Sequence, residues 1–205
     1  MATVQSAPIM PAVILETERL RLRSLLEHDI DDVHASCVDP ELQRWIPLPA
    51  PGLPYTRESA EHFCLNVAPA IRTGGDGQHW AVVDRATGRF TGSVALLRTQ
   101  WAAMVTEIGY WISPWGRGRG LATEAVVAVS RWALGQGFQR VELKAATGNT
   151  GSCRVAEAAG FVREGTDRNA MPLHEGRSDL ASFGLVPGDV GRGPGLLPLP
   201  DRVGP

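Results

Sequence analysis

Glycine and arginine alternate over the five residues from Gly116 to Gly120. This stretch is the strongest indication of a functional site in the sequence. Glycine lets the backbone turn tightly and approach a ligand with no Cβ in between. The apolar spacing that begins at Leu121 predicts a helix, whose N-terminus presents unpaired N–H groups and a partial positive charge. Two arginines beside such a terminus add to that charge. The pattern therefore predicts a site for a phosphate or diphosphate group.

Two common phosphate-binding loops do not fit this stretch. A Walker loop ends in Gly-Lys-Ser/Thr, whereas the sequence here continues as Gly-Leu-Ala. A dinucleotide fingerprint that began at Gly118 would need a glycine where Thr123 stands. The spacing that remains is Arg117-x-x-Gly120-x-Ala122. An ordinary strand–turn–helix connection, with its arginines in water, is the alternative.

Regular elements on both sides are expected to position this stretch. Residues 107–112 alternate as in a strand that ends before Pro114, and a helix is expected from about Leu121 to Gly135. Further strands are expected at 18–26, 79–84, 89–97, 141–146, 161–164 and 179–186, and further helices at 27–37, 39–46, 57–71 and 149–159. This order predicts a mixed α/β (α+β) fold, with a central, twisted, mostly antiparallel sheet of six to seven strands flanked by four to five helices. We expect a flexible lead-in at 1–15, a single domain at 16–186 and a Pro/Gly-rich tail at 187–205.

Composition and charge narrow the class of protein. The 205 residues are 43% hydrophobic and 20% charged, as in a soluble globular protein, and the net charge of −2 argues against nucleic-acid binding. Three cysteines without a CxxC pair indicate a reducing compartment. No apolar run approaches the ~20 residues that span a bilayer, and the N-terminus lacks a signal-peptide pattern. We therefore expect a cytoplasmic protein, and the near-absence of lysine beside many arginines is typical of a GC-rich bacterial genome.

Five short motifs in order together resemble the GNAT acetyltransferases, and within that family the RimJ/RimL branch. They are TERLRLR at 17–23, Asp39-Pro40 followed by Trp45, EIGYWI at 107–112, RGRGLATEA at 117–125, and Asn149-x-x-Ser152 with AAGF at 158–161. The resemblance covers residues 16–186. It is specific for the family and less specific for the substrate.

The resemblance implies acetyl transfer from acetyl-coenzyme A directly to a primary amine in a ternary complex, with no metal. It places main-chain donors near Trp111, Ile112 and Ser113 against the acetyl and pantetheine part of the coenzyme. It places the pyrophosphate on Arg117, Gly118, Arg119, Gly120, Leu121 and Ala122. Asn149 and Ser152 match family positions near the sulfur, and Arg154 one turn later is either a phosphate contact or an exposed structural arginine.

Catalytic and acceptor-binding roles follow from the same resemblance. Glu107 is the candidate general base and Ser152 the candidate acid that protonates the leaving thiolate. A strand rises ~3.3 Å per residue, so Glu107 lies roughly 15 Å from Ile112 and would act through water unless the acceptor reaches toward it. Trp45 and Tyr55 are expected in the wall of the acceptor groove. Tyr110 faces the other side of the strand and is expected in the core.

Several alternatives remain open at this stage. Glu107 could instead pair with an arginine inside the fold, and Ser152 could make a plain hydrogen bond within the helix N-terminal turn. The acceptor is a protein N-terminal α-amine or a small-molecule amine. The chain could also use a longer acyl group such as succinyl, act as a non-catalytic acyl-coenzyme A sensor or interaction protein, or form a homodimer.

Overall fold

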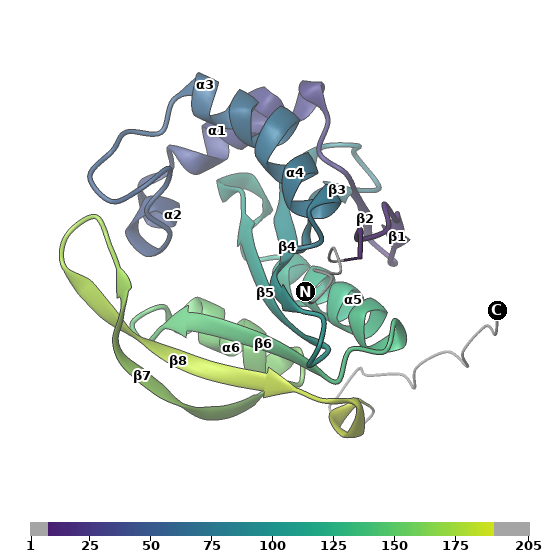
Figure 1. The fold of residues 1–205 in the computed structure, drawn as a ribbon. Helices are drawn as coiled ribbons and strands as arrows, with labels where there is room; N and C mark the ends of the chain where they lie inside the picture. The colour runs from purple at the N-terminus through teal and green to yellow at the C-terminus, as the bar shows by residue number, and fades with distance from the viewer. Residues whose placement is uncertain (1–7, 191–205) are drawn as a thin grey trace, which may run out of the picture.

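The computed structural model describes residues 8–190, and one eight-stranded sheet runs through this part of the chain (Figure 1). In sheet order the strands are β1 (Leu15–Glu16), β2 (Leu20–Arg23), β3 (Gln78–Asp84), β4 (Phe90–Gln100), β5 (Val105–Ile112), β6 (Arg140–Ala146), β8 (Arg177–Leu185) and β7 (Val162–Pro172). Neighbouring strands are antiparallel except for the parallel pair β5 and β6. The mostly antiparallel sheet is confirmed. It has one strand more than expected, because the two residues of β1 pair with β2.

Helices cover the sheet in two groups that come from different parts of the chain. The first group is α1 (Ile30–Cys37), α2 (Pro40–Trp45), α3 (Arg57–His62) and α4 (Ala68–Thr73), with the π-helical stretch η2 (Phe63–Val67) joining α3 to α4. The second group is α5 (Leu121–Gly135) and α6 (Thr150–Ala158). Short 3-10 turns complete the set at η1 (Glu27–Asp29), η3 (Pro114–Gly116) and η4 (Pro187–Asp189). The helix expected at 57–71 is therefore the continuous run of α3, η2 and α4.

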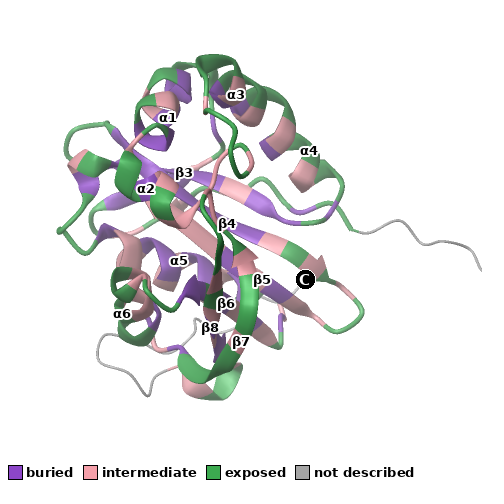
Figure 2. Cartoon of the chain, turned by 90° about the vertical axis from the view of Figure 1, so that its left-hand side faces the viewer, coloured by how far each residue is buried: buried purple, intermediate pink, exposed green. Residues whose placement is uncertain are grey.

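Each group of helices buries a separate hydrophobic core against one face of the sheet (Figure 2). Ala81 belongs to the core on the α1 side and Val82 to the core on the α5 side, because successive strand residues point to opposite faces. We call these the α1 face and the α5 face. On the α5 face, α5 buries Leu121, Ala125, Val126, Val129 and Ala133. Each larger apolar side chain contributes roughly 1.5–3 kcal/mol on burial, so α5 is firmly anchored behind the loop that precedes it.

Both ends of the described chain contact the rest of the fold. Met10 is 1% exposed, its N–H donates to the carbonyl of Arg72, and it belongs to the α5-side core. The indole N–H of Trp80 donates to the carbonyl of Val13 at 3.0 Å and holds the same segment. At the other end, η4 is an ordered turn, and Val190 packs against the α5-side core. The rest of the predicted lead-in (1–7) and tail (191–205) lies outside the described residues.

The sheet opens between its two parallel strands, and this opening positions the site. The β5–β6 pairing begins at Val105 with Arg140 and ends at Ile108 with Leu143. Both strands continue beyond that last pair, β5 to Ile112 and β6 to Ala146. The two strands therefore diverge, and the edges of their final residues face a gap.

Within residues 8–190, no helix combines the length and the apolar character needed to cross a membrane.

Candidate active site

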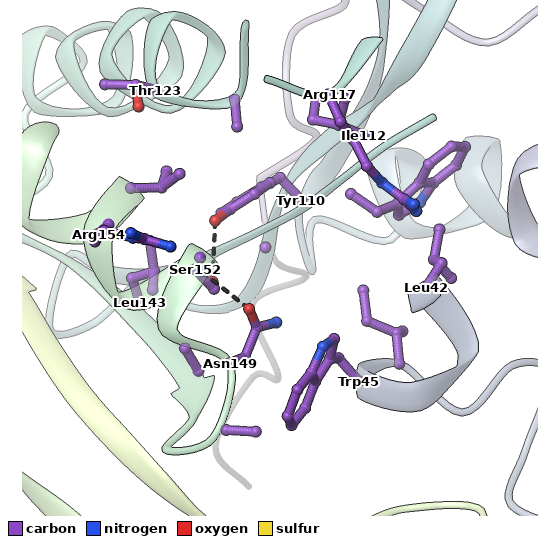
Figure 3. Close-up of a pocket in the computed structure, with 18 of the residues that line it drawn as sticks. Leu42, Trp45, Tyr110, Ile112, Arg117, Thr123, Leu143, Asn149, Ser152 and Arg154 are labelled. Atoms are coloured by element: carbon purple, nitrogen blue, oxygen red, sulfur yellow. Dashed lines mark hydrogen bonds between the residues drawn. The ribbon is translucent and has the colours of Figure 1, made fainter. Parts of the chain in front are cut away.

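A cleft of about 720 Å³ occupies the gap between β5 and β6. Its wall is built from five parts of the chain: α2, the end of β5, residues 116–123, the end of β6 with the start of α6, and Met171 of β7. Figure 3 shows side chains from these elements converging on the same space. The volume lies within the range of pockets that hold a cofactor or drug-sized ligand.

The loop from η3 to α5 reaches the cleft with its backbone. Gly118 has φ +71° and Gly120 has φ +74°, a left-handed conformation that glycine adopts without steric cost. Gly120 is the N-cap of α5, and no side chain caps this helix start. The first N–H groups of a 15-residue helix thus lie at the cleft wall beside Leu121, Ala122 and Thr123. The turn and the helix start lie where the sequence predicts them.

The two loop arginines are held by carboxylates of the protein. Arg119 donates to Oδ2 of Asp84 at 2.6 Å, and this hydrogen bond is the main reason why the pKa of Asp84 lies below its usual range. Arg117 forms an ion pair with Asp39, the N-cap of α2. Both arginines stay exposed to solvent, but each guanidinium is paired with a carboxylate of the fold. These pairs fix the shape of the loop before any ligand arrives.

A third ion pair ties the start of α5 to the residue that precedes β2. Arg19 donates through its backbone N–H and its guanidinium to Glu124, and its NH1 also donates to the carbonyl of Arg119 at 2.7 Å. Burial raises the pKa of Glu124, but hydrogen bonds from Thr17 and Arg19 outweigh it and leave the pKa lowered. Arg19 thus braces the loop while its side chain stays about half exposed.

Tyr110, Ser152 and Asn149 are linked by two hydrogen bonds on the α5 face of the cleft, one of them from the backbone of Ser152 (Figure 3). The hydroxyl of Tyr110 donates to Oγ of Ser152 at 2.9 Å. The N–H of Ser152 donates to Oδ1 of Asn149 at 3.0 Å, so Asn149 is the N-cap of α6. Burial raises the pKa of Tyr110 to about 12, and the phenol stays protonated at neutral pH. Because Ser152 accepts from Tyr110, its own proton is left to donate into the cleft.

Glu107 lies on the opposite face of the same strand. It shares the α1 face with Trp111, which packs against the α1-side core, whereas Tyr110 packs against the α5-side core. The Glu107 side chain lines the cleft, is 16% exposed and forms an ion pair with Arg98. Glu107 thus pairs with an arginine, as one alternative proposed, but Arg98 is 71% exposed and does not lie inside the fold.

Trp45 lines the cleft from the end of α2. Its indole N–H donates to Oε1 of Glu41 at 3.0 Å, and the guanidinium of Arg44 lies 4.7 Å from its ring centroid. The far edge of the ring contacts Gly148, where a Cβ would come within 3.0 Å of it. Trp45 thus spans from α2 to the residues before α6.

Most of the residues predicted for the site line the cleft together. They are Trp45, Glu107, Trp111, Ile112, Arg117, Gly118, Gly120, Leu121, Ala122, Asn149, Ser152 and Arg154. The structure shows where these residues lie, and their roles in binding and catalysis remain predictions.

Three predicted residues lie outside the cleft wall. Ser113 is buried, its N–H donates to the carbonyl of Thr91 at 2.9 Å, and its hydroxyl bonds to that of Ser36. Its amide is therefore engaged and is not presented to a ligand. The guanidinium of Arg119 is directed to Asp84, as described above. Tyr55 packs against the α1-side core with its ring stacked on that of His34, 6.5 Å between centroids.

Tyr110 is the site residue that sequence reasoning missed. We expected it in the core, and its ring does pack there, but its hydroxyl reaches Ser152 in the cleft wall. A buried tyrosine hydroxyl usually finds a hydrogen-bond partner, and that rule was the available signal. Among residues 8–190, no group of three or more His, Cys, Asp or Glu side chains is arranged to hold a metal ion.

Three features define the class of this protein: the opening of the sheet, the glycine-rich helix start and the cleft between them. That class is an acyltransferase. The Acetyltransferase (GNAT) domain family matches residues 19–162, and the chain belongs to this family. It is therefore an acyltransferase enzyme.

Named relatives agree with this class. The chain is 31% identical over 100 residues to "Putative ribosomal N-acetyltransferase YdaF" of Bacillus subtilis (strain 168), a match that covers 48% of this chain and 55% of YdaF. It is 27% identical over 176 residues to the "Uncharacterized N-acetyltransferase YoaA" of the same organism, covering 84% of this chain and 96% of YoaA. The chain thus matches about half the length of YdaF and nearly all of YoaA.

A solved structure shares the fold. Mycobacterium smegmatis RimJ, in complex with a coenzyme A disulfide, superimposes with a TM-score of 0.76 at 20% identity, covering 84% of each chain.

Proposed function

We propose that this enzyme transfers an acetyl group from acetyl-coenzyme A to a primary amine, with both substrates bound at once. The observation that carries the proposal is the divergence of β5 and β6 beyond Ile108 and Leu143, directly in front of the uncapped start of α5. A ligand with a diphosphate at one end and a thioester at the other can lie along this gap. The amine can approach from the α1 face of the sheet.

The residues of the loop fit a coenzyme A diphosphate. Residues 117–122 would hold it with backbone N–H groups and the dipole of α5, and the left-handed glycines leave no Cβ in the way. Bound acetyl-coenzyme A supplies the acetyl group as an activated thioester, so the protein needs no covalent nucleophile. The protein's task is to hold the two reactants in attack geometry.

Proton transfer would be divided between the two faces of β5. Glu107, on the α1 face, would accept a proton from the amine through water, and the ion pair with Arg98 holds its carboxylate in place. Ser152, on the α5 face, would donate its proton to the leaving thiolate while Tyr110 donates to Ser152. Glu107 and Tyr110 point to opposite sides, so the proton acceptor and the proton donor would act from separate faces of β5.

The acceptor we favour is an α-amine or another amine of low pKa. An α-amine has a pKa of ~7.7–8.0, so roughly 10–20% is neutral at pH 7, whereas a lysine amine of pKa ~10.4 is neutral in roughly one molecule in 2,500. Deprotonating the lysine amine costs on the order of 3 kcal/mol more. A base that acts through water suits the easier substrate. The name of YdaF, which refers to a ribosomal substrate, supports a protein N-terminus.

Two linked measurements test the proposal. At 100 times its Kd, acetyl-coenzyme A should stabilise the folded protein by about 2.7 kcal/mol, which for a chain of this length raises Tm by roughly 5–10 °C. A panel of peptides and small amines should then release free thiol, with mass spectrometry identifying the acetylated product. Stabilisation without thiol release would indicate a sensor, and faster turnover with succinyl-coenzyme A would indicate a longer acyl group. No stabilisation by either coenzyme would contradict the proposal.

A further inference from the structure

Lys144 is the only lysine among the 205 residues, and it stands where the sheet opens. It directly follows Leu143, the last residue of β6 in register with β5, and it lines the cleft. Glu142 lies opposite Glu107 in that parallel register, so Lys144, two residues later, has its side chain on the α1 face with Glu107. Leu143 packs in the α5-side core, as this alternation requires. A primary amine is therefore built into the side of the sheet from which we expect the acceptor to approach.

Three carboxylates lie near this amine. Nζ of Lys144 donates to Oδ2 of Asp167 in β7 at 2.8 Å, and the same oxygen accepts from the hydroxyl of Ser182 in β8 at 2.9 Å. The hydrogen bond to Asp167 is the main reason why the pKa of Lys144 lies above its usual value, and the nearby charges of Glu107 and Glu142 raise it further. At rest, Lys144 is thus an ammonium group paired with Asp167.

The pair of Lys144 with Asp167 is easily broken. The side chain of Lys144 is 34% exposed and that of Asp167 is 45% exposed, so water screens the two charges. Ion pairs that are open to solvent in this way contribute little to stability. The flexible four-carbon stem of a lysine lets its nitrogen take several positions around one Cα. The amine can therefore leave Asp167 and turn toward the gap between β5 and β6.

We propose that Lys144 is an internal acceptor, to which the enzyme transfers an acetyl group when no other amine occupies the cleft. This inference rests on the proposed function. The ammonium first loses one proton, and the neutral Nζ attacks the carbonyl carbon of the thioester. The new C–N bond replaces the C–S bond, and the nitrogen gives a second proton to Glu107 through water. The sulfur leaves as the thiol of coenzyme A with a proton from Ser152, which recovers it from solvent. The sum is one acetylated lysine, one thiol and one released proton.

The transfer to Lys144 should be slow, but it needs no encounter in solution. A lysine amine of pKa ~10.4 is neutral in roughly one molecule in 2,500 at pH 7, and the pairing with Asp167 lowers that fraction. Against this, well-oriented reactants that are held together reach effective molarities of about 10⁵ M or more. A free peptide must first diffuse and bind. We therefore expect a single slow acetylation per chain, visible in the absence of a good acceptor.

Acetylation would also change the charge of this part of the sheet. An acetylated lysine nitrogen is neutral, so the ion pair with Asp167 would be lost. Glu107, Glu142 and Asp167 would then lie together with one positive charge fewer among them. The modified protein should for this reason elute later than the unmodified protein from an anion-exchange column.

The test is mass spectrometry of the whole protein after incubation with acetyl-coenzyme A and no added amine. We expect one acetyl group per chain, mapped to Lys144 in the proteolytic peptides. The first-order rate constant should saturate with acetyl-coenzyme A and should not depend on protein concentration, because the transfer occurs within one molecule. A tenfold excess of coenzyme A should slow the reaction at least fivefold by competing for the cleft. The matched control is Lys144→Arg, which keeps a positive charge near Asp167 and should show no mass shift beyond any at the N-terminal α-amine.

Four outcomes would contradict the internal acceptor. Acetylation of added amines with Lys144 left unmodified would overturn its role alone. A rate at Lys144 that coenzyme A does not slow would indicate chemical acetylation from solution, and a rate constant that rises with protein concentration would indicate transfer between molecules. Either result would also overturn the role and leave the proposed function standing. A wild type that binds coenzyme but acetylates neither added amines nor Lys144 would overturn the proposed function, and the internal acceptor with it.

Discussion

The hydroxyl of Tyr110 donates a hydrogen bond to Oγ of Ser152, and this contact joins the diverging end of β5 to the first turn of α6. The contact bridges the gap where the sheet has no backbone pairing. It also leaves the hydroxyl proton of Ser152 available for another acceptor. The same hydrogen bond can therefore brace the open part of the fold and prepare an acid for the leaving group.

Ser152→Ala should lower kcat about 10- to 100-fold and leave coenzyme affinity within a few-fold of the parent. General acids contribute typically 10²- to 10⁴-fold, and a thiolate, whose conjugate thiol has a pKa of about 8.5, needs less help than most leaving groups. Tyr110→Phe should have a smaller effect, because it removes only the donor to Ser152. Initial rates of thiol release and calorimetric titration measure the two quantities. A larger loss in Tyr110→Phe than in Ser152→Ala would make Tyr110 the direct acid.

The double variant Arg117→Ala with Gly120→Asp should weaken acetyl-coenzyme A binding at least tenfold. Aspartate puts a side chain and a negative charge at the N-cap of α5, where the diphosphate would lie, and Arg117 no longer holds the loop against Asp39. The control is Gly88→Asp, at a left-handed glycine of φ +71° in the β3–β4 turn with open space around its Cβ. It carries the same backbone strain and should bind normally. Equal affinity in the double variant and the parent would remove the loop from coenzyme binding.

The loop and α5 could be predicted from the sequence, because the residue patterns that indicate them lie within one short stretch. The alternation of glycine before Leu121 and the apolar spacing after it each depend on near neighbours in the chain, and the structure has the turn and the helix where they were expected. The faces of β5 were also assigned correctly, since alternation is a property of the strand itself. What the strand pattern could not show is that both faces border the cleft. That follows from the divergence of β5 and β6, which is a tertiary feature.

Most of the features that could not be predicted from the sequence depend on contacts between residues that are far apart in the chain. Asp84 meets Arg119 from 35 residues away, and Tyr110 meets Ser152 from 42. The amide of Ser113 is occupied by Thr91 because β4 and β5 pair in one particular register. Neither periodicity nor composition fixes such a register or such a pairing. Site residues chosen by chain position alone therefore included some that face into the fold.

Comparing Glu107→Gln with Arg98→Gln distinguishes two roles for Glu107, a general base or a partner in a structural ion pair. If Glu107 accepts a proton, Glu107→Gln should lower kcat/KM at least tenfold and change the shape of the pH–rate profile, whereas Arg98→Gln should keep most of the activity, because the carboxylate is still present. If the pair is only structural, both variants lose the same ion pair and should lose similar stability. The measurements are pH–rate profiles and urea unfolding. A Glu107→Gln enzyme with the parent's rate and profile would end the role of Glu107 as base.

His79 should make the protein less stable below neutral pH. Burial in β3 against the edge of Phe63, 5.0 Å between ring centroids, lowers the pKa of His79 to about 4 from 6.5. Between these two values the unfolded chain binds more protons than the folded one, so this contribution is complete above pH 6.5 and is lost as the pH falls toward 4.

Urea unfolding at pH 7 and pH 5 should therefore show about 2 kcal/mol of stability lost through His79 over this interval, from the linkage of two such pKa values. His79→Phe removes the titrating group and should flatten the dependence, and the exposed His62→Ala should keep the parent's slope. Hydrogen bonding to Arg119 lowers the pKa of Asp84, whose contribution is lost only at still lower pH, so it does not obscure the interval. A slope in His79→Phe equal to that of the parent would show that another group destabilises the fold in acid.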